Sequence, residues 1–343
     1  MQHAVTASPV RPAHSPWLDL HPPRSVVVFR ALQVGDMLCA VPALRALRRK
    51  LPRARIALVG LPWARQLAER LPELLDEFIA FPGHPGLPEQ VPDPRAFRAF
   101  LHSVQARRFD LALQLHGSGL ITNPLVAQFG TRWQAGFQDG GAASSAHLPY
   151  PEHGHEIQRL LALTTHLGAP AQGEQLVFPL GPDDADELAQ AGIALPNSGQ
   201  PYVCLHPGAR DERRRWPVTR FAELGDALAA QGLRVVLTGS QQEKPLTTML
   251  AAAMRAPVLD TASSISLGAL GHLLRGAQLL VSNDTGVSHL AAALEVPSVV
   301  VFRASEMARW APLDASRHRA VWDPEGVRGQ TVLDEALALL ATA

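Results

Sequence analysis

The chain has 343 residues, of which 47% are hydrophobic and 18% are charged. That much apolar material fills one or two packed cores and excludes an intrinsically disordered protein. The 31 basic and 31 acidic residues balance, which excludes a nucleic-acid binder that works through a large overall positive charge.

Residues 1–24 are predicted to form a flexible tail, because they are rich in proline and histidine and lack the continuous apolar run of a signal peptide. The rest of the chain has no apolar run long enough to span a bilayer. Its two cysteines, Cys39 and Cys204, match no disulfide framework or metal motif. We therefore expect a cytoplasmic protein that contacts a membrane at most peripherally.

Strands and helices alternate through the first half of the chain. Short β-branched runs predict buried strands, and the longer amphipathic stretches between them predict helices. Pro42 falls within the first predicted helix, where it must lie in an early turn or bend the helix. The predicted strands are 25–30, 55–59 and 109–115, and the predicted helices are 36–50, 61–71, 121–129 and 154–167.

A second alternating series follows residues 168–200, which are rich in glycine, proline and glutamine and are interpreted as a linker. Its predicted strands are 202–206, 234–238, 278–282 and 298–302, and its predicted helices are 218–231 and 287–294. This alternation predicts α/β architecture with parallel, doubly wound sheets. We expect two facing domains, 25–180 and 195–343, with a cleft between them.

The first predicted strand leads to Gln33, Gly35 and Asp36, which open the first helix. Gly35 permits an unusual backbone angle or the close approach of a ligand. Ligands of open α/β sheets bind beyond the carboxyl ends of the strands, so Asp36 is placed to take a proton from a hydroxyl group. The same residue also suits an N-cap, in which its side chain accepts from free backbone N–H groups. The local sequence leaves both roles open.

The first strand of the second half leads to His206 and Gly208 and then to three consecutive arginines at 213–215. Arginines on a loop at this edge of a sheet are suited to clamp a phosphate through bidentate hydrogen bonds. A solvated basic loop balanced by Asp211 and Glu212 is the alternative, and the local sequence does not decide between them.

Asp284, Thr285 and Gly286 follow a later strand and open a helix. Backbone N–H groups at such a helix start, together with the helix dipole, form a ready anion site. His289 lies on the first turn of this helix, where it is either structural or a hydrogen-bond donor to a phosphate. The strand-to-helix turn at Gly239 and Ser240 suits the sugar or base of a nucleotide. No metal site is predicted, because no cluster of ligands with the required spacing is present.

Taken together, these segments resemble glycosyltransferase family 9, the heptosyltransferase family, from about residue 25 to about residue 312. Each segment alone is weakly specific, but their joint order and spacing are specific. The segments are Gln33-Val34-Gly35-Asp36 with 41–47, His155-Glu156 with 160–168, His206-Pro207-Gly208-Ala209 with Arg214-Arg215-Trp216-Pro217 and Phe221, and Asp284-Thr285-Gly286 with His289.

The resemblance implies the GT-B arrangement of two facing Rossmann-like domains. It implies that the first domain binds the acceptor and the second binds a nucleotide-sugar, usually ADP-heptose. The implied reaction is an inverting, metal-independent sugar transfer to a lipopolysaccharide-core or related bacterial surface glycan, without a cofactor. Asp36 matches the family's catalytic aspartate. The implied donor contacts are Arg214, Arg215, Asp284, Thr285, Gly286, His289, His206, Gly208, Gly239 and Ser240, and the acceptor-side residues are Gln33 and Gly35.

The sequence departs from the family pattern at two places. Arg214 stands where members often have a phosphate-binding lysine, and residues 303–307, beginning with Arg303, replace a glycine-containing turn. The donor sugar and nucleotide therefore stay open. Another nucleotide-sugar, a GT-B-like nucleotide-sugar epimerase and a degenerate nucleotide-sugar-binding module are kept as alternatives.

The expected partners are a nucleotide-sugar donor and a lipid-linked glycan acceptor, with no nucleic acid. Residues 1–180 contain 17 basic and 13 acidic residues, so the first half suits an anionic acceptor or the cytoplasmic face of the inner membrane. By analogy with related GT-B folds, the helix predicted at 332–340 packs back across the first domain.

Overall fold

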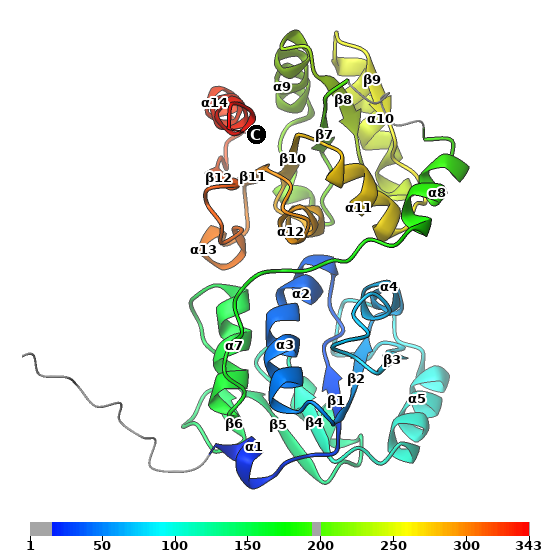
Figure 1. The fold of residues 1–343 in the computed structure, drawn as a ribbon, viewed down its shortest axis with the longest axis vertical. Coiled ribbons are helices and arrows are strands. Elements are labelled where there is room, and N and C mark those ends of the chain that lie inside the picture. Colours follow the sequence, from blue (N-terminus) through cyan, green and yellow to red (C-terminus); the bar gives the residue numbers. More distant parts are fainter. Residues whose placement is uncertain (1–15, 194–199, 343) are drawn as a thin grey trace, which may run out of the picture.

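The computed structural model describes residues 16–193 and 200–342. Its chain forms two lobes, one above the other in Figure 1, each built around a six-stranded parallel sheet. The first sheet has the order β3 (Glu77–Ala80), β2 (Arg55–Gly60), β1 (Ser25–Phe29), β4 (Leu111–Gln114), β5 (Trp133–Gln138) and β6 (His147–Pro149). The second has the order β12 (His318–Trp322), β11 (Ser298–Phe302), β10 (Leu279–Asn283), β7 (Tyr202–His206), β8 (Arg234–Leu237) and β9 (Val258–Asp260).

Each lobe has the doubly wound topology, because its first strand lies at the centre of its sheet with later strands added on both sides. The order therefore reverses between β1 and β4 in the first lobe and between β7 and β10 in the second. Crevices that bind ligands form at such switch points, beyond the carboxyl ends of the strands. The topology thus predicts one ligand-binding crevice in each lobe, at its switch point.

Both faces of the first sheet are buried under helices, as expected for parallel strands. Val26 and Val28 of β1 pack on the side of α2 (Val34–Cys39), α3 (Val41–Lys50) and α7 (Glu156–His166). Val27 and Phe29 point to the other face, toward α5 (Pro94–Ala106) and α6 (Thr122–Ala127). The period of two along β1 therefore explains its unbroken apolar sequence.

The second sheet is buried in the same way. Cys204 and Leu280 face α11 (Leu267–Arg275) and α12 (Gly286–Ala293), on the side that faces the first lobe. Val203 and Leu205 face α9 (Val218–Ala230), α10 (Lys244–Ala253) and α14 (Gly329–Leu340). The remaining described helices are α1 (Trp17–Leu20), α4 (Arg65–Ala68), α8 (Asp183–Gln190) and α13 (Met307–Trp310).

The predicted strands of the second half agree well with the structure, and 202–206 and 298–302 coincide with β7 and β11. The helix predicted at 36–50 is instead two helices, α2 and α3, because the chain turns at Ala40 and Pro42 takes the second position of α3. The predicted linker 168–200 contains α8, which packs against α11, whereas its residues 194–199 lie outside the described part of the chain.

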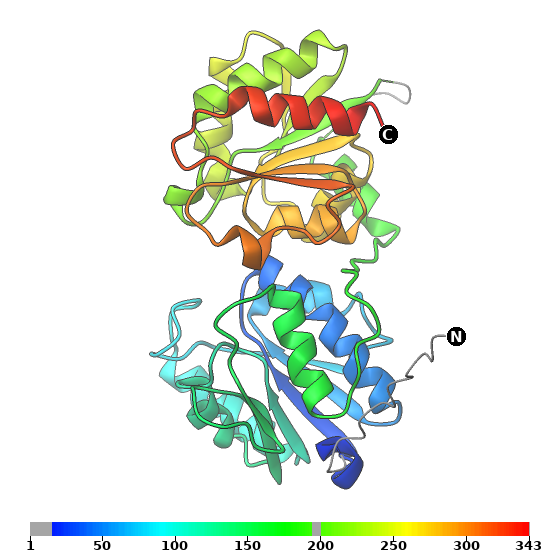
Figure 2. The same cartoon turned by 90° about the vertical axis from the view of Figure 1, so that its left-hand side faces the viewer.

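The structure differs from two further expectations. Part of the tail predicted at 1–24 is packed: Trp17 of α1 is buried, and its ring lies edge-on to that of Trp133, with centroids 5.8 Å apart. Residues 1–15 lie outside the described part of the chain. The expectation that the last helix packs across the first domain is wrong, because α14 packs on α9 and β11 of its own lobe (Figure 2).

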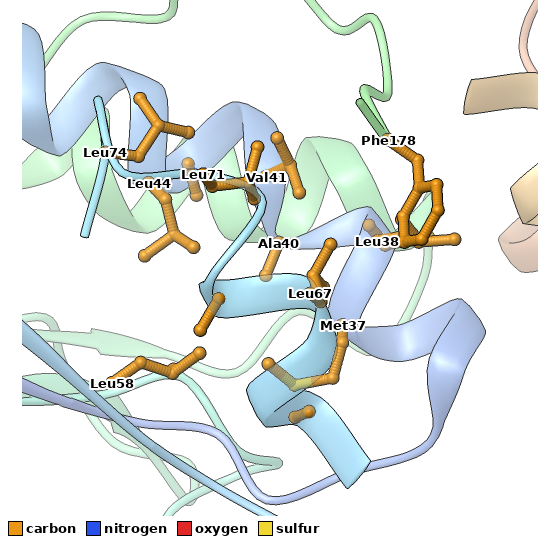
Figure 3. Close-up of a cluster of buried hydrophobic side chains, with 14 of the residues drawn as sticks. Met37, Leu38, Ala40, Val41, Leu44, Leu58, Leu67, Leu71, Leu74 and Phe178 are labelled. Atoms are coloured by element: carbon orange, nitrogen blue, oxygen red, sulfur yellow. The ribbon is translucent and has the colours of Figure 1, made fainter. Parts of the chain in front are cut away.

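The lobes meet where α2 contacts α12, and an apolar cluster continues from one lobe to the other. Figure 3 shows its first-lobe part, in which Met37 and Leu38 of α2 lie near Leu67 of α4 and Phe178 of the segment that crosses between the lobes. The two helices approach closely because glycines face the contact. A Cβ on Gly35 would lie 2.6 Å from Cδ2 of His289, and a Cβ on Gly286 would lie 2.8 Å from Cβ of Val34.

Gly35→Ala is therefore expected to strain the contact between the lobes. Overpacking of this kind costs about 1–3 kcal/mol, which exceeds the gain in helix propensity from alanine. Denaturant unfolding should show this loss of stability. The matched control is Gly329→Ala, where the nearest side-chain atom lies 3.6 Å from the added Cβ. Equal stability of the Gly35→Ala variant and the unmodified protein would contradict the prediction.

Candidate active site

A cavity of about 580 Å³ lies between the lobes, at the two switch points. One wall comes from the loop after β1 and the start of α2, and the other comes from the loop after β7 and the start of α12. Its lining residues are Leu32, Gln33, Gly35, Asp36, Glu89, Ala209, Arg210, Asp211, Arg214, Asp284, Thr285, Gly286, His289 and Trp310. Eight of the residues predicted for the site are among them.

Asp36 lies at the third position of α2, and Gln33 takes the N-cap position without a side-chain cap. The N-cap role for Asp36, which the sequence left open, is therefore not the one observed. About a quarter of the Asp36 side chain (26%) is exposed, and it lines the cavity. Burial raises the pKa of its carboxyl group against the opposing effect of the Arg30 charge. A carboxyl group with a raised pKa is a stronger proton acceptor when ionised.

Arg30 fixes the position of Asp36 from behind. Its guanidinium is buried, and its Nε donates to the backbone oxygen of Asp36 at 2.9 Å. Its Nη1 donates to the backbone oxygen of Leu115, and its Nη2 donates to Oε1 of Glu156 at 2.9 Å. The same Nη2 lies 4.0 Å from Oδ1 of Asp36. Arg30 thus ties β1, the end of β4 and α7 to the start of α2.

The opposite wall has the features of an anion site. Arg214 Nη1 donates to Oδ2 of Asp284 at 3.3 Å, and 38% of the Arg214 side chain is exposed. The Asp284 carboxyl group is buried, and burial raises its pKa. Thr285 is the N-cap of α12, and its side chain makes no cap hydrogen bond. The free N–H groups at this helix start therefore point positive partial charge at the cavity.

His289 separates the cavity from the interior of the contact between the lobes. It is buried, its Nδ1 lies 3.7 Å from Sγ of Cys39, and its ring packs edge-on to that of Trp310. Burial lowers the pKa of His289 to about 4. The ring is therefore neutral near pH 7, so it offers a hydrogen bond rather than a charge.

Five residues predicted for donor binding do not line this cavity. Gly239 and Ser240 line a neighbouring cavity of about 400 Å³ that also involves Val34, Trp63 and Gln66 of the first lobe. They lie beside the anion site, and their role in binding the nucleoside part of a donor stays a prediction.

Arg215, His206 and Gly208 hold the loops in place. Arg215 Nε donates to the backbone oxygen of Ala209 at 2.9 Å, and its Nη1 pairs with Glu212 at 2.8 Å. His206 Nδ1 lies 3.0 Å from the Thr238 hydroxyl oxygen. At Gly208, an added Cβ would displace the carboxyl group of Glu243, which packs against this glycine. The three residues therefore lie behind the cavity wall, where they contact other residues of the second lobe.

Arg303, the departure from the family pattern, also lies behind the wall. Its Nη1 donates to the backbone oxygen of Arg215 at 2.6 Å, and its Nη2 donates to that of Pro324 at 2.7 Å. The arginine therefore joins two loops of the second lobe and does not line the cavity.

The sequence reasoning missed Glu89 and Trp310. Glu89 lies on the loop between β3 and α5, lines the cavity beside Asp36, and has Oε1 3.9 Å from Nε2 of His116. Burial raises the pKa of the Glu89 carboxyl group. Trp310 ends α13, on the second lobe. Neither residue belongs to a recognised motif. Tertiary packing alone brings the loop of Glu89 and the end of α13 to the cavity.

Within residues 16–193 and 200–342, no group of three or more His, Cys, Asp or Glu side chains is arranged to hold a metal ion. In the same part of the chain, no helix has both the length and the apolar character needed to cross a membrane.

Comparison with known proteins gives consistent matches. The model of glycosyltransferase family 9 (heptosyltransferase) matches residues 97–342. Lipopolysaccharide heptosyltransferase 2 of Salmonella typhimurium is 27% identical over 294 residues, which cover 81% of this chain and 82% of the relative.

Two solved structures share the fold. A family 9 glycosyltransferase of Veillonella parvula has a TM-score of 0.78 at 17% identity, covering 93% of this chain and 98% of its own. The "ADP-heptose lps heptosyltransferase II" of Escherichia coli has a TM-score of 0.72 at 24% identity, covering 93% and 99%. The predicted GT-B arrangement of two facing Rossmann-like lobes with parallel sheets is confirmed.

Arg30→Met is expected to destabilise the protein strongly, because it removes one partner of Glu156 and the hydrogen bonds to the backbone oxygens of Asp36 and Leu115. Breaking a buried ion pair costs about 3–5 kcal/mol, and denaturant unfolding measures this loss. Arg98→Met, on the exposed face of α5, is the control and should change stability by less than about 0.5 kcal/mol. An equally small effect of Arg30→Met would show that the network is not structural.

Proposed function

The chain belongs to glycosyltransferase family 9, the heptosyltransferase family, and on that premise we propose that it transfers a heptosyl group from ADP-heptose to a hydroxyl group of a lipopolysaccharide-core acceptor. One observation carries the proposal. A single cavity contains Asp36 on one lobe and, on the other, an anion site formed by Arg214 and the start of α12. A base and a diphosphate site facing one another are what a transfer between two substrates requires.

In the proposed mechanism, Asp36 accepts the proton of the acceptor hydroxyl while its oxygen forms a bond to C1 of the donor sugar. The bond from C1 to the diphosphate oxygen breaks, and ADP leaves with the electron pair. Attack from the face opposite the leaving group inverts the configuration at C1. The raised pKa of Asp36 supports its role as the base.

The diphosphate gains negative charge as it leaves, and preorganised donors at that point lower the barrier. We assign this role to Arg214 and to the backbone N–H groups at Thr285 and Gly286, with Asp284 orienting Arg214 through the 3.3 Å contact. We propose that these groups meet the charge of the diphosphate without a divalent cation. The nucleoside is assigned to the neighbouring cavity with Gly239 and Ser240.

The first lobe is assigned to the acceptor, and Gln33, Gly35 and Glu89 line its side of the cavity. We place the enzyme in the cytoplasm, where it meets a lipid-linked acceptor at the inner face of the membrane. The excess of basic residues in the first half supports an anionic acceptor. Product analysis separates this proposal from a nucleotide-sugar epimerase, which changes the donor without an acceptor.

Asp36→Asn is expected to lower the transfer rate by a factor of about 10²–10⁴, the usual contribution of a general base. ADP affinity should stay nearly unchanged, because the anion site lies on the other lobe. Rates come from product formation with ADP-heptose and a heptose-acceptor core, and Asp139→Asn on an exposed loop is the matched control. Turnover by Asp36→Asn at the unmodified rate would remove Asp36 as the base.

Arg214→Ala is expected to weaken ADP binding about tenfold, which corresponds to roughly 1.4 kcal/mol. Isothermal titration with ADP, UDP and GDP, in EDTA and then with Mg²⁺, measures this effect, and Arg213→Ala, whose side chain is 82% exposed, is the control. Preference for UDP or GDP would exclude ADP-heptose but keep the glycosyltransferase class. ADP binding that requires Mg²⁺ would contradict metal independence.

A further inference from the structure

We propose that Arg309, on the second lobe, is a positioning residue for Asp36, on the first. Arg309 pairs with Glu156 across the contact between the lobes. Because Glu156 then competes less for Arg30, the charge of Arg30 can stabilise the ionised carboxyl group of Asp36. The inference rests on the proposed function, because it takes Asp36 as the base. It adds a way for the second lobe to control the protonation state of Asp36 through a residue that contacts neither substrate.

Arg309 adds an ion pair with two hydrogen bonds to the contact between the lobes. Arg309 Nε and Nη2 donate to Oε2 of Glu156 at 3.0 and 2.7 Å. The same Nη2 donates to the Tyr150 hydroxyl oxygen at 2.7 Å. Glu156 is buried, whereas 26% of the Arg309 side chain is exposed. Charge-assisted pairs with this geometry are strong and directional.

Glu156 joins this contact to the base through its other oxygen. Oε1 accepts from Nη2 of Arg30 at 2.9 Å, and the same Nη2 lies 4.0 Å from Oδ1 of Asp36. One guanidinium therefore faces two carboxylates. With Arg309 docked, Glu156 has a second cation and competes less for Arg30. With the lobes apart, Glu156 keeps Arg30 and a more distant Arg159, at 3.8 Å, and Asp36 is less stabilised as an anion.

A second hydrogen bond holds the same two elements together. His155, the N-cap of α7, accepts through Nδ1 from the backbone N–H of Ile157 at 3.2 Å. That leaves its Nε2–H to donate to the backbone oxygen of Ala311, the residue after α13, at 2.9 Å. Adjacent residues of α7 thus contact both ends of the short segment 309–311. The docking of Arg309 is therefore part of a built interface.

The charged groups around Asp36 come from four elements. Arg30 follows β1, Glu156 begins α7, Arg309 lies on α13, and Glu89 lies on the loop after β3. Arg30 and Arg309 lower the pKa of Asp36, and Glu156 raises it. Across the cavity lie the charged groups of Arg210, Asp211, Arg214 and Asp284 and the neutral ring of His289. Removal of Arg309 must therefore raise the pKa of Asp36, and removal of the Glu156 charge must lower it.

The test compares pH profiles of kcat for Arg309→Gln, Arg309→Lys and Glu156→Gln in the full chain, with ADP-heptose and acceptor. Asp36 acts when ionised, so activity falls as pH drops through its pKa. Arg309→Gln should move this acid limb to higher pH and lower kcat at pH 6 roughly three- to tenfold relative to its own value at pH 8. Glu156→Gln should move the limb to lower pH, and Arg309→Lys should restore most of the unmodified profile.

Arg319→Gln, which removes a half-buried ion pair with Glu335 within the second lobe, is the matched control and should leave the profile unchanged. ADP affinity of Arg309→Gln should stay within about twofold of the unmodified value, because Arg309 does not line the cavity. A fall in kcat at every pH without a shift of the limb, or shifts of the same sign for Arg309→Gln and Glu156→Gln, would overturn the inference. If instead Asp36→Asn stays active, the proposed base fails and not only its control by Arg309.

Discussion

The buried guanidinium of Arg30 is the interaction on which the rest of the site depends. A charge removed from water is tolerated only when it is paired and fully hydrogen-bonded. Arg30 meets this condition with the backbone oxygens of Asp36 and Leu115 and the carboxylate of Glu156. Three segments distant in the sequence thereby take fixed positions around one residue. The start of α2, and with it the Asp36 carboxyl group, is held by the same bonds that satisfy the buried charge.

The site is divided between the lobes because each sheet contributes its own switch point. Neither lobe alone contains both Asp36 and the wall formed by Arg214 and the start of α12, so the proposed chemistry depends on how closely the lobes approach. The absence of side chains at Gly35 and Gly286 sets that distance. Polar contacts of α7 with the end of α13 then fix the orientation. At this interface the glycines thus set the distance between the lobes, and the polar contacts set their orientation.

Local patterns in the sequence predicted the central strands, since runs such as β7 and β11 are mostly apolar and buried on both faces. They missed β3, β5, β6, β9 and β12, which lie toward the edges of the two sheets. They also placed Asp36, Arg214 and Asp284 beyond the carboxyl ends of central strands, where topology places ligands, but left the roles of Asp36 and Arg214 open. The same patterns did not reveal Glu89, Trp310 or the role of Arg309. These residues lie on loops or short helices, and only long-range packing brings them to the cavity. The family motif His155-Glu156 was recognised without a role, because its partners are more than a hundred residues away in the sequence.

The chain crosses between the lobes once, after α7, and α14 stays with its own lobe (Figure 2). Each described lobe is therefore a contiguous stretch of sequence. Recombination within the crossing segment would exchange the whole second lobe for another and leave the first lobe intact. The new combination would need few matched residues. These are the glycines where α2 meets α12 and the pair of Glu156 on α7 with Arg309 on α13. With donor and acceptor divided between the lobes as proposed, such a chain would diversify each substrate independently, by exchange of whole lobes rather than by point changes.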